Sequence, residues 1–311
     1  MTRKPGDEWQ GRHLPVLGAG VLAAAAVALL MVAPAVGGPV AAATKYLTAP
    51  YKGTTSNSYT NVTYTSCATS HAGSPKWLPS NGTANLLGSV KTKTCTSANG
   101  GGYGTVTQYL TINVPFRVGF NGTHLVRSNW TLTLGSTSAF TQGGCPAKIV
   151  NYNPPQYTSS SAGCSSGAHR TFQMYAQVVD LSGSSAFRSN GSSVYAWNDS
   201  SWSNYTSCYT YYSTPSCYNN TGGYSNGASY GYNAPGFASF TWNGKTTLRM
   251  WTNASYMVKT DRFVLEMSIY LTTSADSVGY NLVKFWPASA TSVLDLASGG
   301  NGAKLDSLTI T

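Results

Sequence analysis

The strongest constraint on the fold is a strict alternation of apolar and polar residues. In VTQYLTINVPFRVGF, residues 106–120, the even positions are mostly apolar and the odd positions mostly polar. Successive side chains of a strand point to opposite faces, so this pattern predicts a strand with one buried and one solvated face. Pro115 lies on the polar face and lacks a backbone N–H, which predicts a sheet edge or a bend there.

The same alternation recurs in HLVRSNWTLTL (124–134), TFQMYAQVVDL (171–181) and RFVLEMSIYL (262–271), and no segment shows a helical period. A last strand is expected near the C-terminus, with Leu308 and Ile310 facing inward. Many short strands with turn-rich connections predict an all-β antiparallel sandwich, jelly-roll-like in topology. Asn243-Gly244 predicts a hairpin between FASFTW and KTTLRMW, with Phe240 on the same face as Leu248 and Met250.

Two polar stretches are expected to be long loops stapled by disulfides. One is Ser-rich, at residues 158–168, and the other is rich in Tyr, Gly and Asn, at 205–236. We expect one extracellular domain at 44–311, within which 44–100 could form a separate N-terminal set of strands. The glycine-rich run at 97–104 would be the hinge between them.

The first 43 residues predict export. Arg3, Lys4 and Arg12 precede a stretch without charge, from Leu14 to Ala43. This is typical of a signal peptide cleaved before Thr44, but the apolar part is also long enough for an uncleaved N-terminal membrane anchor. In both cases the rest of the chain lies outside the membrane, at the cell surface or in the medium.

Six cysteines follow this segment, and an even number in an exported chain predicts disulfides. Short loops close most easily, which favours the pairs Cys67–Cys95, Cys145–Cys164 and Cys208–Cys217. The cysteines lack the close spacing of a zinc site, so no metal is expected. Nine sequons predict N-glycosylation in a host with the machinery: Asn61, Asn81, Asn121, Asn129, Asn190, Asn198, Asn204, Asn219 and Asn253.

Charge is sparse but strongly biased. Only 9% of the residues are charged, while the net charge is +10. The excess could be scattered over the surface, or it could form a patch for acidic glycans or lipids. Lys91 and Lys93 are the densest cluster, and no nucleic-acid motif is present, so no nucleic-acid partner is expected. With few carboxylates to protonate, the fold should tolerate acidic surroundings.

Catalytic candidates are few. Seven carboxylates follow the export segment, and Glu266 lies centrally in an expected strand. An amide from Gln173 or Gln177 beside Glu266 could activate water at low pH, as in an acid-active peptidase; a glycosidase would need a second carboxylate. The alternative is that Glu266 is simply an outward-facing polar residue. No histidine after the export segment is spaced from another His, Cys or carboxylate as metal ligands are; these histidines are His71, His124 and His169. No cofactor motif is present.

Aromatic side chains are the remaining candidates for binding, because Tyr and Trp combine a flat apolar ring with a polar group. The candidates lie in or beside the Tyr-rich stretch: Tyr209, Tyr211, Tyr212, Tyr218, Trp197 and Trp202. They could bind a glycan or a surface protein, or they could only pack this stretch over the sandwich.

The sequence therefore predicts an exported glycoprotein with a binding or structural role. A hydrolase that uses Glu266 is the first alternative, and a surface-layer or filament subunit is the second. A glycan-binding protein should show exposed aromatic residues gathered on one face, whereas a hydrolase should show a polar partner for Glu266. The oligomeric state stays open.

Overall fold

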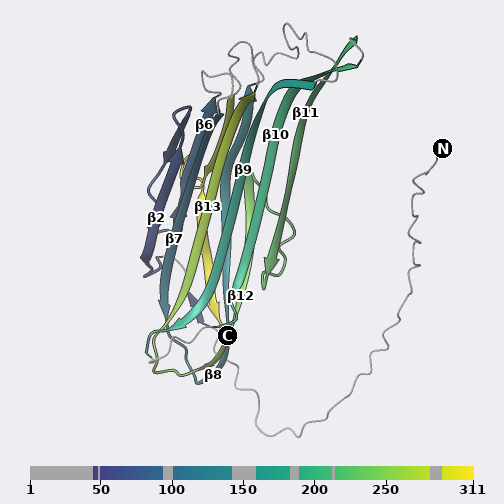
Figure 1. Ribbon diagram of the computed structural model, residues 1–311. Coiled ribbons are helices and arrows are strands. Elements are labelled where there is room, and N and C mark those ends of the chain that lie inside the picture. Colours follow the sequence, from purple (N-terminus) through teal and green to yellow (C-terminus); the bar gives the residue numbers. More distant parts are fainter. Residues whose placement is uncertain are drawn as a thin grey trace, which may run out of the picture. The chain divides into compact units, whose positions relative to one another are not determined.

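The computed structural model describes residues 45–47, 50–93, 101–141, 159–182, 189–211, 214–280 and 289–311, and its regular elements are all β-strands (Figure 1). Residues 1–43, the predicted signal or anchor, lie outside the described residues. Within the described part, no helix is long and apolar enough to cross a membrane. The described strands pair antiparallel throughout, as predicted.

Six long strands form one sheet, in the order β11-β10-β9-β13-β7-β2, and they run side by side in Figure 1. The strands of this sheet are β2 (Thr54–Tyr64), β7 (Gly101–Phe116), β9 (Ser159–Asp180), β10 (Ser192–Tyr211), β11 (Thr214–Tyr232) and β13 (Phe263–Tyr280). In β7, Pro115 lies past the end of the pairing with β2, which begins opposite Asn113. The missing N–H therefore interrupts no ladder with β2.

The second sheet has nine strands, in the order β3-β6-β14-β8-β15-β5-β4, with β1 paired to β15 and β12 to β8. Its strands are β1 (Lys45–Leu47), β3 (Ala68–Ala72), β4 (Lys76–Leu78), β5 (Thr83–Asn85), β6 (Leu87–Lys93), β8 (Gly122–Thr141), β12 (Gly244–Met257), β14 (Ser289–Asp295) and β15 (Gly302–Ile310). The final strand is confirmed, and both Leu308 and Ile310 are buried.

One face of each sheet contributes to a common hydrophobic core, which makes the arrangement sandwich-like. Phe172 and Leu265 of the six-stranded sheet belong to the same buried cluster as Trp130 and Leu248 of the nine-stranded sheet. The apolar positions of the alternating segments, such as Leu110, Met174 and Ile269, are buried. Removal of these side chains from water is the main favourable term for folding.

The N-terminal strands do not form a separate set. β1 pairs with β15, β2 with β7, and β6 with β14, so residues from 44–100 are distributed over both sheets. Residues 42–311 form one compact unit. The expectation of a distinct N-terminal set is therefore wrong, because backbone pairing with distant strands is invisible to local composition.

The two predicted loops are mostly strand. The described part of the Ser-rich run belongs to β9, and most of the stretch at 205–236 belongs to β10 and β11, which pair from Ser193–Tyr232 to Tyr211–Thr214. The stretch was mistaken for a loop because β11 is an edge strand, exposed over most of its length. A strand that is solvated on both faces carries no apolar alternation.

The predicted hairpin around Asn243-Gly244 is also wrong. β12 begins at Gly244, where φ is 136°, and pairs with β8, while residues 237–243 are not strand. The Phe240 N–H instead donates to Ser229 Oγ at 3.1 Å. Phe240 still packs in the core with Leu248 and Met250, because its ring can be buried without backbone pairing to another strand.

Candidate functional site

The six-stranded sheet carries a row of tyrosines on its outer face, the face that points away from the nine-stranded sheet. Register pairs Tyr59 with Tyr109, Tyr109 with Tyr270, and Tyr195 with Tyr230. Gln173 joins the two halves, because it pairs with both Tyr270 and Tyr195. The tyrosine row, defined as these five tyrosines with Gln173, crosses all six strands, a width of about 24 Å at the usual strand spacing.

The tyrosine rings contact one another at both ends of the row. The ring centroids of Tyr59 and Tyr109 lie 5.2 Å apart, and those of Tyr195 and Tyr230 lie 5.1 Å apart. Tyr59 and Tyr230 are 45% and 61% exposed, so the row reaches solvent. Burial, and then the neighbouring phenols of Tyr270 and Tyr109, raise the pKa of Tyr59, so it stays a neutral hydrogen-bonding group.

Uncharged hydroxyl groups surround the row. The Tyr109 hydroxyl lies 3.0 Å from Ser268 Oγ, and Thr107 Oγ1 lies 3.2 Å from Thr272 Oγ1. Cross-strand pairs of this kind stabilise the sheet by a few tenths of a kcal/mol to about 1 kcal/mol each. They also leave a surface that combines aromatic edges with neutral donors and acceptors.

Glu266 has a polar partner on the same face. Gln177 of β9 is its direct cross-strand neighbour and donates a hydrogen bond from Nε2 to Glu266 Oε1. Gln177 is only 7% exposed, and its Oε1 accepts a hydrogen bond from the Tyr175 hydroxyl at 3.2 Å. Of the two predicted amides, the structure places Gln177 beside Glu266, whereas Gln173 lies in the tyrosine row.

A second carboxylate does not join Glu266 from its own strand or from the end of β9. Asp276 lies ten residues further along β13, about 33 Å away in an extended strand. Asp180 of β9 pairs with the core residue Phe263, which places it on the opposite face from Glu266. The local geometry therefore fits a carboxylate–amide pair rather than the two carboxylates of a glycosidase.

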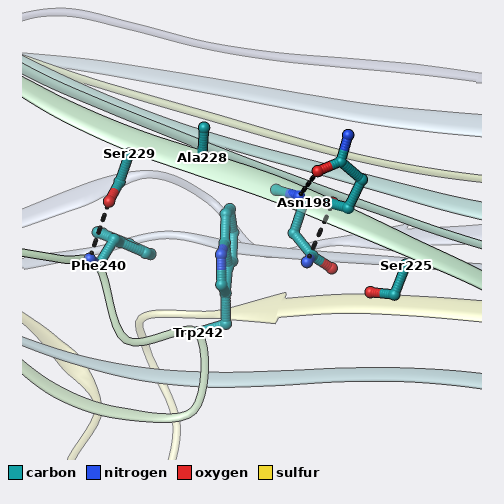
Figure 2. A pocket seen from close by; sticks show the side chains of 8 residues that line it. Asn198, Ser225, Ala228, Ser229, Phe240 and Trp242 are labelled. Carbon is teal, nitrogen blue, oxygen red and sulfur yellow. Dashed lines mark hydrogen bonds between the residues drawn. The ribbon is translucent and has the colours of Figure 1, made fainter. Parts of the chain in front are cut away.

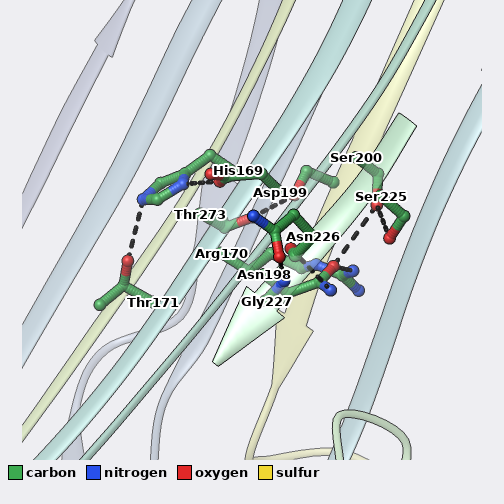
Figure 3. Close-up of polar contacts among 11 residues, drawn as sticks. His169, Arg170, Thr171, Asn198, Asp199, Ser200, Ser225, Asn226, Gly227 and Thr273 are labelled. Carbon is green, nitrogen blue, oxygen red and sulfur yellow. Dashed lines mark hydrogen bonds and ion pairs between the residues drawn. The ribbon is translucent and has the colours of Figure 1, made fainter. Parts of the chain in front are cut away.

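A hydrogen-bonded chain of Asp199, His169 and Thr171 lies further along the outer face (Figure 3). His169 Nδ1 contacts Asp199 Oδ1, and its Nε2 lies 2.9 Å from Thr171 Oγ1, an order that resembles a catalytic triad. Thr171 is only 8% exposed, however, and lies between β13 and β10. The backbone N–H groups around Thr171 take part in the pairing of β9 with β13 and β10, so they are not free to stabilise an oxyanion.

Asp276 lies near the Asp199–His169–Thr171 group, because it pairs with Gly167, two residues before His169. Its carboxylate occupies the space above Gly167 of β9, where a Cβ would collide with it, and burial raises its pKa. Within the described residues, no three His, Cys, Asp or Glu side chains are close enough to hold a metal ion.

A second candidate surface is a pocket of about 500 Å³ beside β10 and β11 (Figure 2). Asn198 and residues 225–229 line one side of it, and Phe240 and Trp242 line the other. Trp242 belongs to the loop that follows β11, and its ring points from this loop toward the strands. This combination of an aromatic ring with amide and hydroxyl groups is common in sites for small polar ligands.

A buried cation supports this pocket. Arg170 is 6% exposed and donates a hydrogen bond to Asn198 Oδ1 (Figure 3). It also donates to Ser136 Oγ and lies 5.4 Å from the centre of the Trp242 ring. Burial lowers the pKa of Arg170. Since its guanidinium orients two lining residues, Arg170 positions the pocket wall.

The predicted aromatic candidates fall into different environments. Trp202 is 6% exposed and packs against Cys164 and Phe140, so it is a core residue rather than a binding platform. Trp197 is half-buried on the outer face, and Tyr218 of β11 is 53% exposed. Tyr209 and Tyr211 lie in β10, and Tyr212 lies outside the described residues.

The Cys208–Cys217 disulfide is present and links directly opposed residues of β10 and β11, with Cα atoms 4.0 Å apart. It therefore staples a strand pair rather than a loop. Cys67 and Cys164 are also disulfide-bonded. Cys95 and Cys145 lie outside the described residues, so the pairs Cys67–Cys95 and Cys145–Cys164 stay predictions.

The sequons differ in accessibility. The exposed ones are Asn61, Asn81, Asn121, Asn190 and Asn253. Asn129 donates to Ser307 Oγ at 2.8 Å, Asn204 accepts from Thr221 Oγ1 at 3.1 Å, and Asn198 is held by Arg170. These three are half-buried and engaged with neighbours, which makes them poorer acceptors for a glycan.

The sequence reading missed most of the tyrosine row. Tyr109 and Tyr270 occupy polar positions of strands that alternation identifies, and a tyrosine at a solvated strand position was the available signal. Their alignment with Tyr59 depends on strand order and register, which the sequence does not show. The chain matches no protein-family model and no curated protein sequence, so the functional argument depends on this geometry.

Proposed function

We propose that this chain is an exported β-sandwich protein that binds carbohydrate through the outer face of its six-stranded sheet. The observation that carries the proposal is the tyrosine row, which brings five aromatic residues from five strands into one line. Sugar rings are amphipathic, so they contact aromatic groups through their C–H faces while their hydroxyls bond to neutral polar groups. The row and its Thr and Ser neighbours offer both kinds of contact.

Export is part of the same proposal. The Cys208–Cys217 disulfide is compatible with an oxidising compartment, and the uncharged segment at 14–43 would be the signal or anchor. A jelly-roll-like topology, N-glycosylation and a location outside the cell also belong to the proposal. N-glycosylation and a location outside the cell fit a polar surface in a chain of which only 9% of the residues are charged.

The test is binding of neutral oligosaccharides to the protein made in a host that does not glycosylate it. Six-sugar fragments of β-glucan, mannan and chitin would be titrated by calorimetry. We expect one class to bind, and the double variant Tyr109→Ala/Tyr270→Ala to weaken it at least about tenfold, since each aromatic contact contributes about 1 kcal/mol.

The matched control is Tyr256→Ala, because Tyr256 is 64% exposed but lies in the nine-stranded sheet. It should bind like the wild type. The proposal fails if no oligosaccharide binds to the wild-type protein, or if the double variant binds as tightly as the control.

A second candidate function is acid-active hydrolysis, and the Gln177–Glu266 hydrogen bond is the observation that favours it. An amide that orients a carboxylate could position a water molecule for attack on a peptide bond, with Glu266 as general base or acid. Casein hydrolysis at pH 3–5 tests this. Activity should be lost in Glu266→Gln, fall in Gln177→Ala and persist in Asp261→Asn. Absence of any cleavage by the wild-type protein would eliminate the hydrolase.

A further inference from the structure

Four cations line a pocket of about 440 Å³ near the ends of β7 and β13. Lys45 and Lys52 come from the N-terminal part of the domain, and Arg117 and Arg262 from the ends of two central strands. All four side chains are exposed, and no carboxylate belongs to the lining. The pocket is therefore strongly positive, in a chain whose charged residues make up only 9% of the total.

The fold brings these cations together through strand register. Phe116 and Phe263 are direct neighbours in β7 and β13, so Arg117, which follows one, and Arg262, which precedes the other, lie at the same end of the sheet. Lys45 reaches that end because β1 pairs with the last strand, where Lys45 lies opposite Ile310. The sequence separates these residues by up to 217 positions, from 45 to 262.

None of the four lining cations forms an ion pair in the described part of the chain. The ion pairs there are His169–Asp199 and Lys304–Asp306, and neither includes a lining cation. The two carboxylates closest in sequence are engaged locally: Asp180 accepts from the Ser182 N–H at 2.7 Å, and Asp261 accepts from Thr260 Oγ1 at 3.3 Å. Like charges gathered without a partner repel one another and attract anions.

The pocket also has an apolar component. The rings of Phe116 and Phe263 stack with centroids 5.9 Å apart and belong to the lining, together with Pro115 and Leu181. The volume lies within the range of small-ligand sites. A concave site of this size, with cations around apolar groups, fits a small amphipathic ring that carries a negative charge better than a flat membrane or a nucleic-acid backbone.

We propose that this pocket binds the acidic group, a carboxylate or a sulfate ester, of an anionic sugar. Arg117 and Arg262 bind the acid through their guanidinium forks, and Lys45 and Lys52 add to the attraction. The choice of a sugar rests on the proposed function, whereas the choice of an anion does not. Arg262 lies eight residues from Tyr270, about 26 Å along an extended strand, so one acidic oligosaccharide could reach both sites.

The experiment compares two probes with the same sugar backbone, one acidic and one neutral: an oligogalacturonate of eight sugars and its methyl ester. Binding to the full chain would be measured by calorimetry at two salt concentrations. We expect the acid to bind at least about tenfold more tightly than the ester, and added salt to reduce this preference. Arg117→Ala/Arg262→Ala should remove most of the preference, because only Lys45 and Lys52 remain, and Arg117→Lys/Arg262→Lys should restore part of it.

The matched control is Lys245→Ala/Arg249→Ala, which removes the same charge from exposed positions of β12 and should keep the preference. Thermal unfolding shows that each variant is folded. Equal binding of acid and ester, an unchanged preference in the Arg117/Arg262 variant, or binding only to phosphatidylglycerol vesicles would overturn the proposal.

The two proposals can fail separately. If Tyr109→Ala/Tyr270→Ala leaves binding unchanged while the arginine variant loses the acid preference, the tyrosine row is wrong and the anionic site stands. If the tyrosine variant weakens acid and ester alike while the arginine variant behaves as the wild type, the tyrosine row stands and the anionic site is wrong.

Discussion

The two faces of the six-stranded sheet come from the same strands but differ in role: the inner face packs in the core, and the outer face is exposed to solvent. In β9, Phe172 and Met174 point into the core and are fully buried, whereas Gln173 between them lies on the outer face in the tyrosine row. β13 shows the same contrast, with Ile269 inside and Tyr270 outside. One face supplies burial energy, and the other is free to carry recognition because its residues are not needed for packing.

The inner face itself changes along the strands. Near the middle it is apolar, but further along it becomes a network of hydroxyls, in which Thr273 Oγ1 lies 2.7 Å from Ser292 Oγ and Thr92 Oγ1 lies 2.9 Å from Ser277 Oγ. Beyond this network, the Cys208–Cys217 disulfide links β10 to β11. Covalent and hydrogen-bonded contacts thus supplement two smaller apolar clusters toward that end of the sheet.

The largest effect should come from the inner face. Phe172→Ala should lower the free energy of unfolding by about 3–5 kcal/mol, because it removes buried area and leaves a cavity. Gln173→Ala, one position away on the outer face, should change it by less than about 0.5 kcal/mol. Denaturant unfolding of both variants measures the contrast, and a similar cost for the two would contradict the division into faces.

Loss of the disulfide should have the next largest effect. Cys208→Ala/Cys217→Ala should cost about 2.5 kcal/mol, since the bond closes a short loop in the unfolded chain. Hydrogen exchange should rise first in β10 and β11, whereas the amides of β7 and β13 should stay protected. Uniform loss of protection across the sheet would show that the strand pair and the core unfold as one unit.

A tyrosine of the outer face should matter less to stability than to binding. Tyr109→Ala removes a stacked cross-strand partner of Tyr59 and should cost about 1 kcal/mol or less. The neighbouring Leu110→Ala, on the inner face, should cost about 2–5 kcal/mol. Thermal unfolding of both variants tests this, and a cost for Tyr109 equal to that for Leu110 would assign the row a mainly structural role.

The smallest effect concerns Asp276 and pH. Burial raises its pKa, so the folded state binds the proton more readily than the unfolded state, and this favourable term disappears as the pH rises through the raised pKa. Asp276→Asn should therefore raise the Tm at pH 7 and leave it unchanged near pH 3. Partial exposure limits the gain to about 0.5 kcal/mol. A lower Tm at pH 7 would instead indicate a favourable partner for the ionised carboxylate.

Alternation predicted the central strands well because one of their faces is buried in the core and the other faces water. β7, β13 and most of β9 were expected from residues such as Ile112, Met174 and Leu265, each of which is buried. The edge hairpin escaped prediction because β11 has no buried face. The same reasoning pointed to Glu266 as an outward residue, but it could not choose between Gln173 and Gln177, which share a strand face.

By itself, the sequence determined the class of fold, the inward and outward positions of the central strands, and a chemistry of neutral hydroxyls, tyrosines and excess cations. These are local properties, since they follow from side-chain period and composition. Only the tertiary structure decided which tyrosines align, that Gln177 is the partner of Glu266, and that Lys45, Lys52, Arg117 and Arg262 share one pocket. The reason is physical: strand order and register bring residues together across long stretches of chain, and backbone pairing leaves no mark in local sequence.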